Sequence, residues 1–327
     1  MHEQPSTTAP GPMAEGTPVA APGGQPQKPL PGSRREMIET VIQALLYGAA
    51  LVSIITSAAI LFVLFSESLR FFQRVPVQDF LFGLTWSPNI EPFRYGVIPL
   101  VVGTMHIVIG SAFISLPAGL AIGIYLSEYA SPRARNIIKP VLEVLAGIPT
   151  VVFGYFALMF ITPLLRQIFG QDVVSSYNSA SGSIVVGIMI LPTVASLCED
   201  AFHAVPNSLR QGAYALGATP FEVSTRVVLP AALSGVMAAF ILAFSRAIGE
   251  TMAVTLAAGS VAQITPNPFE PIFTMTAYIA VTAKGENPHD STAYYTLFAV
   301  GLLLFVITLA LNLLADRIRK RFREVYE

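Results

Sequence analysis

Long apolar segments separated by short polar ones make up most of this chain. A helix that crosses a membrane needs about 20 consecutive, mostly apolar residues. Six segments are candidates, of which the fourth is short; they cover residues 40–65, 97–126, 141–165, 183–197, 231–258 and 292–315. The pattern predicts an all-α polytopic membrane protein with six transmembrane helices.

The third and fourth candidate spans are interrupted. Gly147, Pro149 and Gly154 fall in the third, and Pro192 falls in the fourth. A proline inside a helix leaves a backbone carbonyl without its usual partner, and in a membrane only protein or water can satisfy it. We therefore expect these helices to pack against other helices or to border a water-filled cavity, with an ordinary packed kink as the alternative at each proline.

Composition agrees with the membrane class. Only 12% of the residues are charged and 53% are hydrophobic, whereas soluble domains carry about 25% charged residues. The formal net charge of −1 argues against a nucleic-acid partner, which would require a basic excess. The single cysteine, Cys198, cannot form a disulfide within the chain.

Residues 1–33 have a different composition, with many Pro, Gly, Ala, Thr and Gln residues and few large apolar ones. Such a segment buries too little apolar surface to offset the entropy of ordering it. No apolar stretch follows a basic one there, as a signal peptide would need. We expect a disordered tail at residues 1–33 and a transmembrane domain over residues 34–327.

The basic residues indicate the orientation. Cytoplasmic loops of membrane proteins are enriched in Lys and Arg. With six spans, most basic residues fall on one side: Arg34, Arg35, Arg133, Arg135, Lys139, Arg210, Arg226, Arg317, Arg319, Lys320, Arg321 and Arg323. The first outer loop is an exception, with Arg70, Arg74 and Arg94. We expect both termini, and hence the tail, to be cytoplasmic.

The inner loop at about residues 199–230 is too long and too regular to be a plain connection. Ser208 is a plausible helix N-cap, and Gly217 followed by Pro220 indicates a helix stop and a turn. A second short helix is predicted over residues 220–228. The loop is expected to form a helix–turn–helix on the cytoplasmic face, with Gly217 at the sharp turn.

This loop resembles the signature loop of ABC-importer permeases, which reads Glu-Ala-Ala, three residues, Gly, nine residues, Ile, any residue, Leu-Pro. The spacing here is the same, and it places six residues in the motif: Gln211, Gly212, Ala213, Gly217, Leu229 and Pro230. Gln211 and Gly212 depart from the usual Glu and Ala, which affects contacts that need the carboxylate rather than the fold of the loop. The resemblance implies that a soluble ATPase binds this loop. A surface helix pair without a partner is the alternative.

Further stretches resemble the permeases of the phosphate-specific transport (Pst) family over nearly all of the chain from Arg35 onward. They are Trp86-Ser87-Pro88, Tyr95-Gly96-Val97-Ile98-Pro99, Tyr125-Leu126-Ser127-Glu128-Tyr129, the run from Glu143 to Gly154, and Arg246-Ala247-Ile248-Gly249-Glu250-Thr251. The long first outer loop is most similar to that of the C-type subunit.

The resemblance implies the type I ABC importer permease (MetI-like) architecture in a bacterial inner membrane. It also implies a heterodimer with an A-type Pst permease, a cytoplasmic ABC ATPase dimer and an extracytoplasmic phosphate-binding protein, with inorganic phosphate as the transported ion.

Arg246 and Glu250 are the charged residues that fall near the middle of a predicted span. A lone charge at that depth costs at least about 2.5–3.5 kcal/mol, so such residues face protein or water. At a spacing of four they can share one helix face and pair. We expect Arg246 to provide positive potential in the anion path, with Glu250 holding it; the matching Pst residues are placed in that path. Mutual neutralisation against a packed neighbour is the alternative. His106 and Glu143 are weaker candidates.

The chain has no G-x-x-x-x-G-K-[ST] loop, no H-E-x-x-H and no Cys/His cluster, so we expect neither enzymatic activity, nor a cofactor, nor a metal site. Three alternatives to phosphate import stay open. They are import of another oxyanion such as sulfate or molybdate, secondary transport or a channel without an ATPase, and a membrane enzyme, which the missing catalytic motifs disfavour.

Overall fold

The computed structural model is helical throughout the membrane part of the chain and describes residues 34–285, 288 and 290–321. The tail predicted at residues 1–33 lies outside the described residues. The chain divides into two compact units, residues 1–58 and residues 59–327. In the first unit, the described part of helix α1 (Arg34–Phe72) has exposed side chains at every position from residue 37 to residue 58. A helix so apolar must be covered by lipid or by another chain.

Among the described residues, five helical segments are long and apolar enough to cross a membrane: Met37–Phe72, Ile98–Tyr129, Thr150–Phe169, Ser179–His203 and Thr292–Ile318. A sixth results if Pro220–Ala231 and Leu233–Gly249, which meet at a bend of 72°, count as one broken span. The prediction of a polytopic helical membrane protein is confirmed. Five of the six predicted spans correspond to the five helical segments, and the predicted span at residues 231–258 corresponds to the second arm of the bent pair, Leu233–Gly249.

The third span begins later than predicted. Residues 132–147 form a separate helix, α4 (Pro132–Gly147), which has no buried residue. The span itself consists of α5 (Thr150–Phe156), the π-helical turn η2 (Ala157–Ile161) and α6 (Thr162–Phe169). Proline disfavours helical backbone in the residue before it, and Ile148 is extended, with φ −68° and ψ 130°. The break at Pro149 is therefore a boundary between two helices, so the predicted start at residue 141 is wrong.

The fourth span, in contrast, is longer than predicted. Helix α7 (Ser179–His203) is continuous through Pro192 and is capped by Asn178, whose side chain accepts a hydrogen bond from the Ser181 amide. Its first turns are rich in Ser and Gly, which hydropathy does not favour, but they are buried against protein rather than lipid. Pro192 is buried as well, as expected for a proline packed against other helices.

Helix α3 (Ile98–Ile124) packs along α7 through small residues. A Cβ atom added to Gly119 would lie 2.6 Å from Cγ1 of Val194, and one added to Gly123 would lie 2.8 Å from Cβ of Cys198. Small residues let membrane helices approach closely, and packing then holds them together. The α3–α7 pair therefore forms the centre of the larger unit.

Gly119→Val is expected to disrupt this pair, because overpacking a core typically costs about 1–3 kcal/mol. The measurement is the yield and the thermal unfolding midpoint of the purified protein in detergent. Gly48→Val is the matched control, because no atom lies within 4 Å of a Cβ at Gly48. Equal behaviour of the two variants would contradict close packing at Gly119.

The first outer loop folds into a small structure instead of an extended connection. Helix α2 (Val77–Phe82) is followed by strand β1 (Trp86–Ser87), which pairs antiparallel with β2 (Arg94–Tyr95). Edge-to-face contacts join the rings of Phe71, Phe80, Trp86 and Tyr278, the last from α13 (Met275–Lys284). Sequence inspection identified the loop but not this hairpin, because strands of two residues carry no periodicity.

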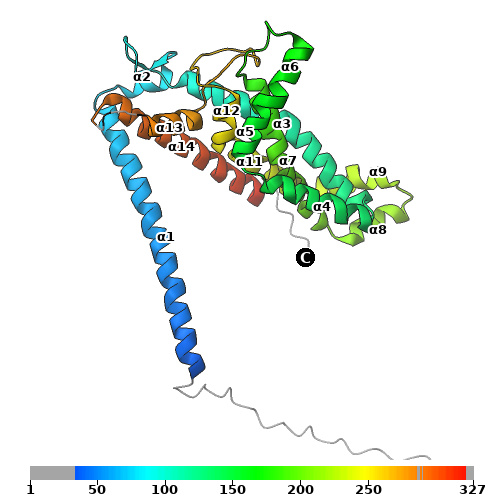
Figure 1. Cartoon of the computed structure of the whole chain (residues 1–327). Coiled ribbons are helices and arrows are strands. Elements are labelled where there is room, and N and C mark those ends of the chain that lie inside the picture. Colours follow the sequence, from blue (N-terminus) through cyan, green and yellow to red (C-terminus); the bar gives the residue numbers. More distant parts are fainter. Residues whose placement is uncertain (1–33, 286–287, 289, 322–327) are drawn as a thin grey trace, which may run out of the picture. The chain divides into compact units, whose positions relative to one another are not determined.

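The remaining helices complete the larger unit. Helices α11 (Leu233–Gly249) and α14 (Thr292–Arg321) pack against each other, and α12 (Met252–Ala257) packs against α5 and α7. Figure 1 shows α2 toward one end of this unit, and α8 and α9, described below, toward the other. By the predicted orientation, the end with α8 and α9 is the cytoplasmic one.

Candidate transport and coupling sites

The loop that follows α7 forms two short helices joined by a tight turn, as predicted. The first is α8 (Asn207–Ala215), and the second runs through α9 (Pro220–Glu222), the π-helical η3 (Val223–Val228) and α10 (Leu229–Ala231). Ser208 is not the N-cap, because the helix already begins at Asn207 and Pro206 occupies the capping position. The prediction of the cap was therefore wrong by two residues.

Gly217 ends the first helix in a left-handed conformation. Its φ is +82°, a region that glycine adopts readily and that β-branched residues almost never enter. The amide of Gly217 donates to Tyr214 O at 2.9 Å, and the amide of Ala218 donates to Ala213 O at 3.2 Å. These two bonds are the Schellman arrangement that satisfies the last carbonyls of a helix. Because a Cβ at Gly217 would meet no atom within 4 Å, its requirement is conformational.

The start of the second helix is equally well defined. The Thr219 side chain accepts a hydrogen bond from the Glu222 amide, and the Glu222 carboxylate accepts one from the Thr219 amide at 3.0 Å. This reciprocal capping box, with Pro220 at the first helical position, fixes where the helix begins. The turn between the helices is thus set at both ends by local chemistry.

The tip of the loop exposes apolar side chains. The exposed fraction is 90% for Leu216, 69% for Phe221 and 46% for Tyr214. Val223 and Val228, on the opposite side, are buried in the core. A projecting element that is anchored on one face and apolar at its tip has the properties of a protein-interaction site.

The six motif residues divide between these two surfaces. Gln211, Gly212, Gly217 and Pro230 are exposed, whereas Ala213 and Leu229 are half-buried and pack against the core. The departures from the usual motif, at Gln211 and Gly212, therefore lie where a partner can contact them. The residues that match the motif at Ala213 and Leu229 attach the loop to the membrane unit.

Arg210 fastens α8 to the ends of two spans. Its guanidinium group donates to Glu128 Oε1 at 2.9 Å and to the carbonyls of Phe202 at 2.7 Å and Val205 at 2.5 Å. Glu128 belongs to the π-helical turn η1 (Tyr125–Tyr129) that ends α3. The Phe202 carbonyl belongs to the last turn of α7, and the Val205 carbonyl to the turn that follows this helix. The exposed fraction of the Arg210 and Glu128 side chains is 15% and 8%. We call this group, Arg210, Glu128 and the two carbonyls, the loop clamp.

A second charged cluster joins α4 to α7. The Glu199 carboxylate is 3.0 Å from Lys139 Nζ and 3.5 Å from Arg135 Nε, at ion-pair distance but poorly aligned for hydrogen bonds. Arg135 also donates to the carbonyl of Leu126 at 2.6 Å. Sequence inspection used these basic residues only as orientation signals. It missed both clusters, because their acidic partners lie more than 50 residues away along the chain.

Arg246 and Glu250 do not share a helix face. Helix α11 ends at Gly249, and Glu250 is extended, with φ −68° and ψ 127°. Its carboxylate, in a 9% exposed residue, accepts a hydrogen bond from the Ala253 amide at 3.0 Å at the start of α12, and its carbonyl accepts one from Thr276. Among the described residues no ion pair joins Arg246 to Glu250, so the expected pairing one helical turn apart is wrong. The reason is the end of the helix between them.

Arg246 is exposed in the isolated chain and is oriented by α7. Its Nη1 donates to Thr193 Oγ1 at 2.9 Å, beside Pro192. Thr193 also lines a hollow of about 340 Å³ between α4 and α7, together with Lys139 and Glu199. The guanidinium therefore lies in the last turn of α11, with N–H donors available to a ligand. Such a position suits an anion better than a lipid chain.

The family described as "Binding-protein-dependent transport system inner membrane component" matches residues 119–324. Among curated relatives, the probable ABC transporter permease protein YqgH of Bacillus subtilis is 34% identical over 289 residues, covering 88% of this chain and 93% of that protein. The phosphate transport system permease protein PstC of Mesorhizobium japonicum is 33% identical over 250 residues, covering 70% of this chain and 74% of that protein.

Two solved structures have the same fold. A bacterial alginate ABC transporter in complex with an alginate-bound periplasmic protein gives a TM-score of 0.58 at 16% identity, covering 88% of this chain and 98% of that one. An inward-facing methionine ABC transporter, MetNI, gives a TM-score of 0.53 at 20% identity, covering 72% and 100%. These likenesses show the MetI-like permease fold.

Proposed function

We propose that this chain, which belongs to the family of inner membrane components of binding-protein-dependent transport systems, is a permease subunit of an ATP-driven phosphate importer. The observation that carries the proposal is the projecting loop, with its Gly217 turn and apolar tip, in a chain whose relatives include several PstC permeases. Phosphate is the ion that those relatives' names give.

In this proposal the cytoplasmic ATPase dimer binds the loop at about residues 199–230. Leu216, Phe221 and Tyr214 supply apolar contacts, and Gln211 and Gly212 lie on the exposed side of α8. The loop clamp then transmits a movement of the loop to the ends of α3 and α7, because Arg210 binds both. ATP hydrolysis takes place in the partner chain and not in this one.

The remaining assignments follow from the same proposal. Arg246 and Glu250 lie in the anion path, which an A-type permease completes, and an extracytoplasmic binding protein delivers phosphate. Residues 34–327 form the permease domain, and both termini are cytoplasmic. The lipid bilayer covers the apolar helices.

The test uses the complete complex, reconstituted in proteoliposomes with its ATPase and a phosphate-loaded binding protein. We expect uptake of labelled phosphate that requires ATP, with sulfate and molybdate competing poorly. Preferential uptake of sulfate or molybdate would show the alternative oxyanion importer, since Arg246 would serve any of these anions. Uptake without ATP or without the ATPase would refute the proposal.

Gly217→Val is expected to abolish ATP-driven uptake while the protein remains in the membrane. Valine at φ +82° is strongly disfavoured, so the turn must rearrange and the tip must move. The measurements are uptake in proteoliposomes and co-purification of the ATPase.

Gly48→Val is the matched control for this variant. Gly48 is also exposed, no atom lies within 4 Å of a Cβ there, and it lies within helix α1, outside the loop, where valine is at least as well tolerated as glycine. Normal uptake and normal ATPase association in Gly217→Val would contradict the coupling role of the turn.

A further inference from the structure

The outer end of the third span borders a hollow of about 660 Å³. Its walls come from η2, α6 and the turn that leads to α7, and among the described residues that line it Arg166 is the charged one. The other polar groups that line it are the neutral side chains of Thr162, Gln167, Gln171, Ser176 and Tyr177. A hollow with one guanidinium, several neutral donors and no lining carboxylate has the chemistry of an oxyanion site.

Arg166 is held in a fixed orientation. Its Nε donates to Val174 O at 2.9 Å and its Nη2 donates to Ser176 Oγ at 3.1 Å. The turn that supplies these acceptors is itself fixed, because the Ser175 amide donates to Phe269 O at 3.0 Å and Asn178 donates to Thr162 Oγ1 at 3.3 Å. A guanidinium oriented in this way loses little further entropy when a ligand binds its remaining N–H groups.

The hollow is close to the outer end of α12. A Cβ on Gly259, which follows α12, would lie 3.0 Å from Tyr177 Cβ, and the Asn178 amide donates to Ala257 O at 3.1 Å. Arg246 precedes the other end of α12, whose six residues span about 9 Å. Helix α5, which continues into η2, packs along α12 at Gly154 and Ala253. The two arginines therefore lie beyond opposite ends of one short helix.

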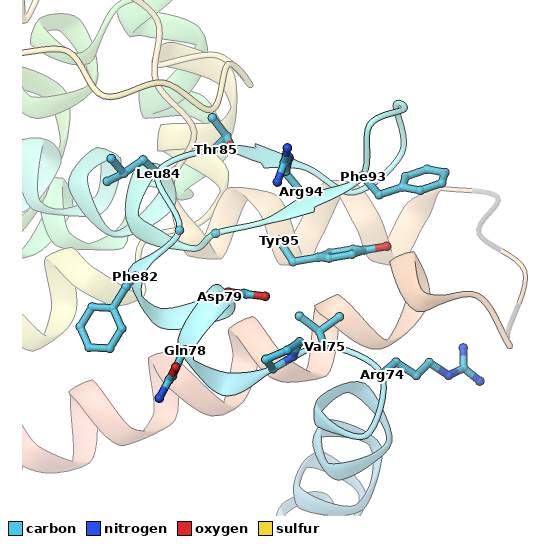
Figure 2. A pocket seen from close by; sticks show the side chains of 13 residues that line it. Arg74, Val75, Gln78, Asp79, Phe82, Leu84, Thr85, Phe93, Arg94 and Tyr95 are labelled. Atoms are coloured by element: carbon cyan, nitrogen blue, oxygen red, sulfur yellow. The ribbon is translucent and has the colours of Figure 1, made fainter.

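The larger outer hollow, of about 860 Å³ beside α2 and the β1–β2 hairpin, is different. Figure 2 shows the Asp79 carboxylate between α2 and Tyr95, with the Arg74 guanidinium directed away from it. Arg74 donates to the carbonyl of Asp290 and lies over the Tyr295 ring. A carboxylate inside the hollow disfavours an anion there, so Arg166, and not the arginines of the first outer loop, has the better surroundings for one.

We propose that the hollow around Arg166 is an entry site for a phosphate oxyanion, occupied before the ion reaches Arg246. The direction of transfer rests on the proposed function, whereas binding at Arg166 does not. Because the hollow is open, binding is weak and the ion can leave inward, as transport through successive sites requires. A lipid headgroup has the same phosphate chemistry, so the experiment must separate the two sources.

The test is protection of a thiol placed in the hollow. The native cysteine, Cys198, is fully buried, so Gln167→Cys introduces an accessible thiol that an uncharged, membrane-impermeant maleimide can label. In the full complex in phospholipid nanodiscs, at constant ionic strength set with chloride, inorganic phosphate is expected to slow labelling. The expected factor is about threefold at twice the dissociation constant. Protection should disappear when Arg166→Gln is added. It should return in part with Arg166→Lys, which keeps the positive charge but not the planar guanidinium that donates two parallel hydrogen bonds.

Uptake gives the second readout. Arg166→Gln is expected to lower ATP-driven phosphate uptake several-fold in a complex that still assembles, whereas Arg94→Gln, an equal change of charge at the rim of the other hollow, leaves uptake unchanged. If Arg166 had a purely structural role, Arg166→Gln would still lower uptake. Phosphate would then not protect the thiol of the Gln167→Cys variant in which Arg166 is intact.

Two results would overturn the entry site. One is the absence of protection by phosphate in a complex that takes up phosphate normally. The other is slow labelling in phospholipid nanodiscs that free phosphate does not change, together with fast labelling in phospholipid-free maltoside micelles, which would identify a lipid headgroup as the occupant. Either result leaves the importer proposal intact, because that proposal is tested separately by ATP-driven phosphate uptake of the unmodified complex.

Discussion

Arg246→Gln should lower phosphate uptake by about tenfold to a hundredfold while the protein is still inserted. A hydrogen bond to a charged group contributes about 1.5–3 kcal/mol. Glutamine removes both the positive charge and the planar guanidinium that can donate two parallel hydrogen bonds to an oxyanion. In the folded chain the variant loses only one bond, to Thr193 Oγ1, so stability should change little. The measurement is initial uptake in proteoliposomes, normalised to the amount of assembled complex.

The hydrogen bond between the Glu250 carboxylate and the Ala253 amide predicts different effects for two substitutions of Glu250. Glu250→Gln keeps an oxygen that can accept from the Ala253 amide, so α12 stays capped and the variant tests the charge alone. Glu250→Leu removes the cap as well. Since Arg246 and Glu250 do not pair, their effects should add instead of compensating each other.

Arg246→Leu combined with Glu250→Leu should therefore insert into the membrane and still fail to transport. Exchanging the two charges should fail too, because neither new side chain would reach the partners of the old one. Thr193→Val is the graded control, since it removes the bond that orients Arg246 but not the charge. Near-normal uptake by the double leucine variant would place the anion path in other residues or in the partner permease.

Features that depend on local sequence could be predicted. Runs of apolar residues located the spans, since lipid selects for them over about 20 residues. The spacing of Gly217 and Leu229-Pro230 located the helix–turn–helix loop, and the sharp turn forms there because glycine readily adopts a φ of +82°. The candidate pair Arg246 and Glu250 was found because charges are rare at that depth.

Features that depend on backbone breaks or on distant partners could not be predicted. Residues 141–147 read as the start of a span, yet extended backbone at Ile148 assigns them to α4. No proline marks the end of α11 at Gly249, and a single glycine inside a helical pattern does not by itself end a helix. The sequence therefore favoured a regular helix with Arg246 and Glu250 on one face. The Ser and Gly residues that begin α7 are buried by protein, which hydropathy does not detect.

Arg210→Met should uncouple the transporter. Arginine at this position bonds Glu128 and two backbone carbonyls with side-chain exposure of 15%, and methionine leaves all three acceptors without that donor. Breaking a buried ion pair by removing one partner costs about 3–5 kcal/mol. We expect uptake to be lost while the ATPase still hydrolyses ATP, because the side-chain bonds that hold α8 against the ends of α3 and α7 would be absent.

Companion variants separate the two parts of the loop clamp. Arg210→Lys should fail nearly as badly, since one ammonium cannot reach all the acceptors that surround the two terminal nitrogens of the guanidinium. Glu128→Leu combined with Arg210→Met should recover only part of the loss. It removes the unpaired carboxylate but leaves the carbonyls of Phe202 and Val205 without their donor.

Arg226→Gln is the control for the clamp, because Arg226 lies in the same loop, pairs with Glu222 only loosely at 3.6 Å and is 77% exposed. Such exposed pairs contribute at most about 1 kcal/mol, so this variant should transport normally. The measurements are uptake and ATP hydrolysis in the same proteoliposomes, reported as phosphate moved per ATP hydrolysed. If Arg210→Met kept the normal ratio, the loop would be attached through its apolar face, at Val223 and Val228, and the clamp would have no part in coupling.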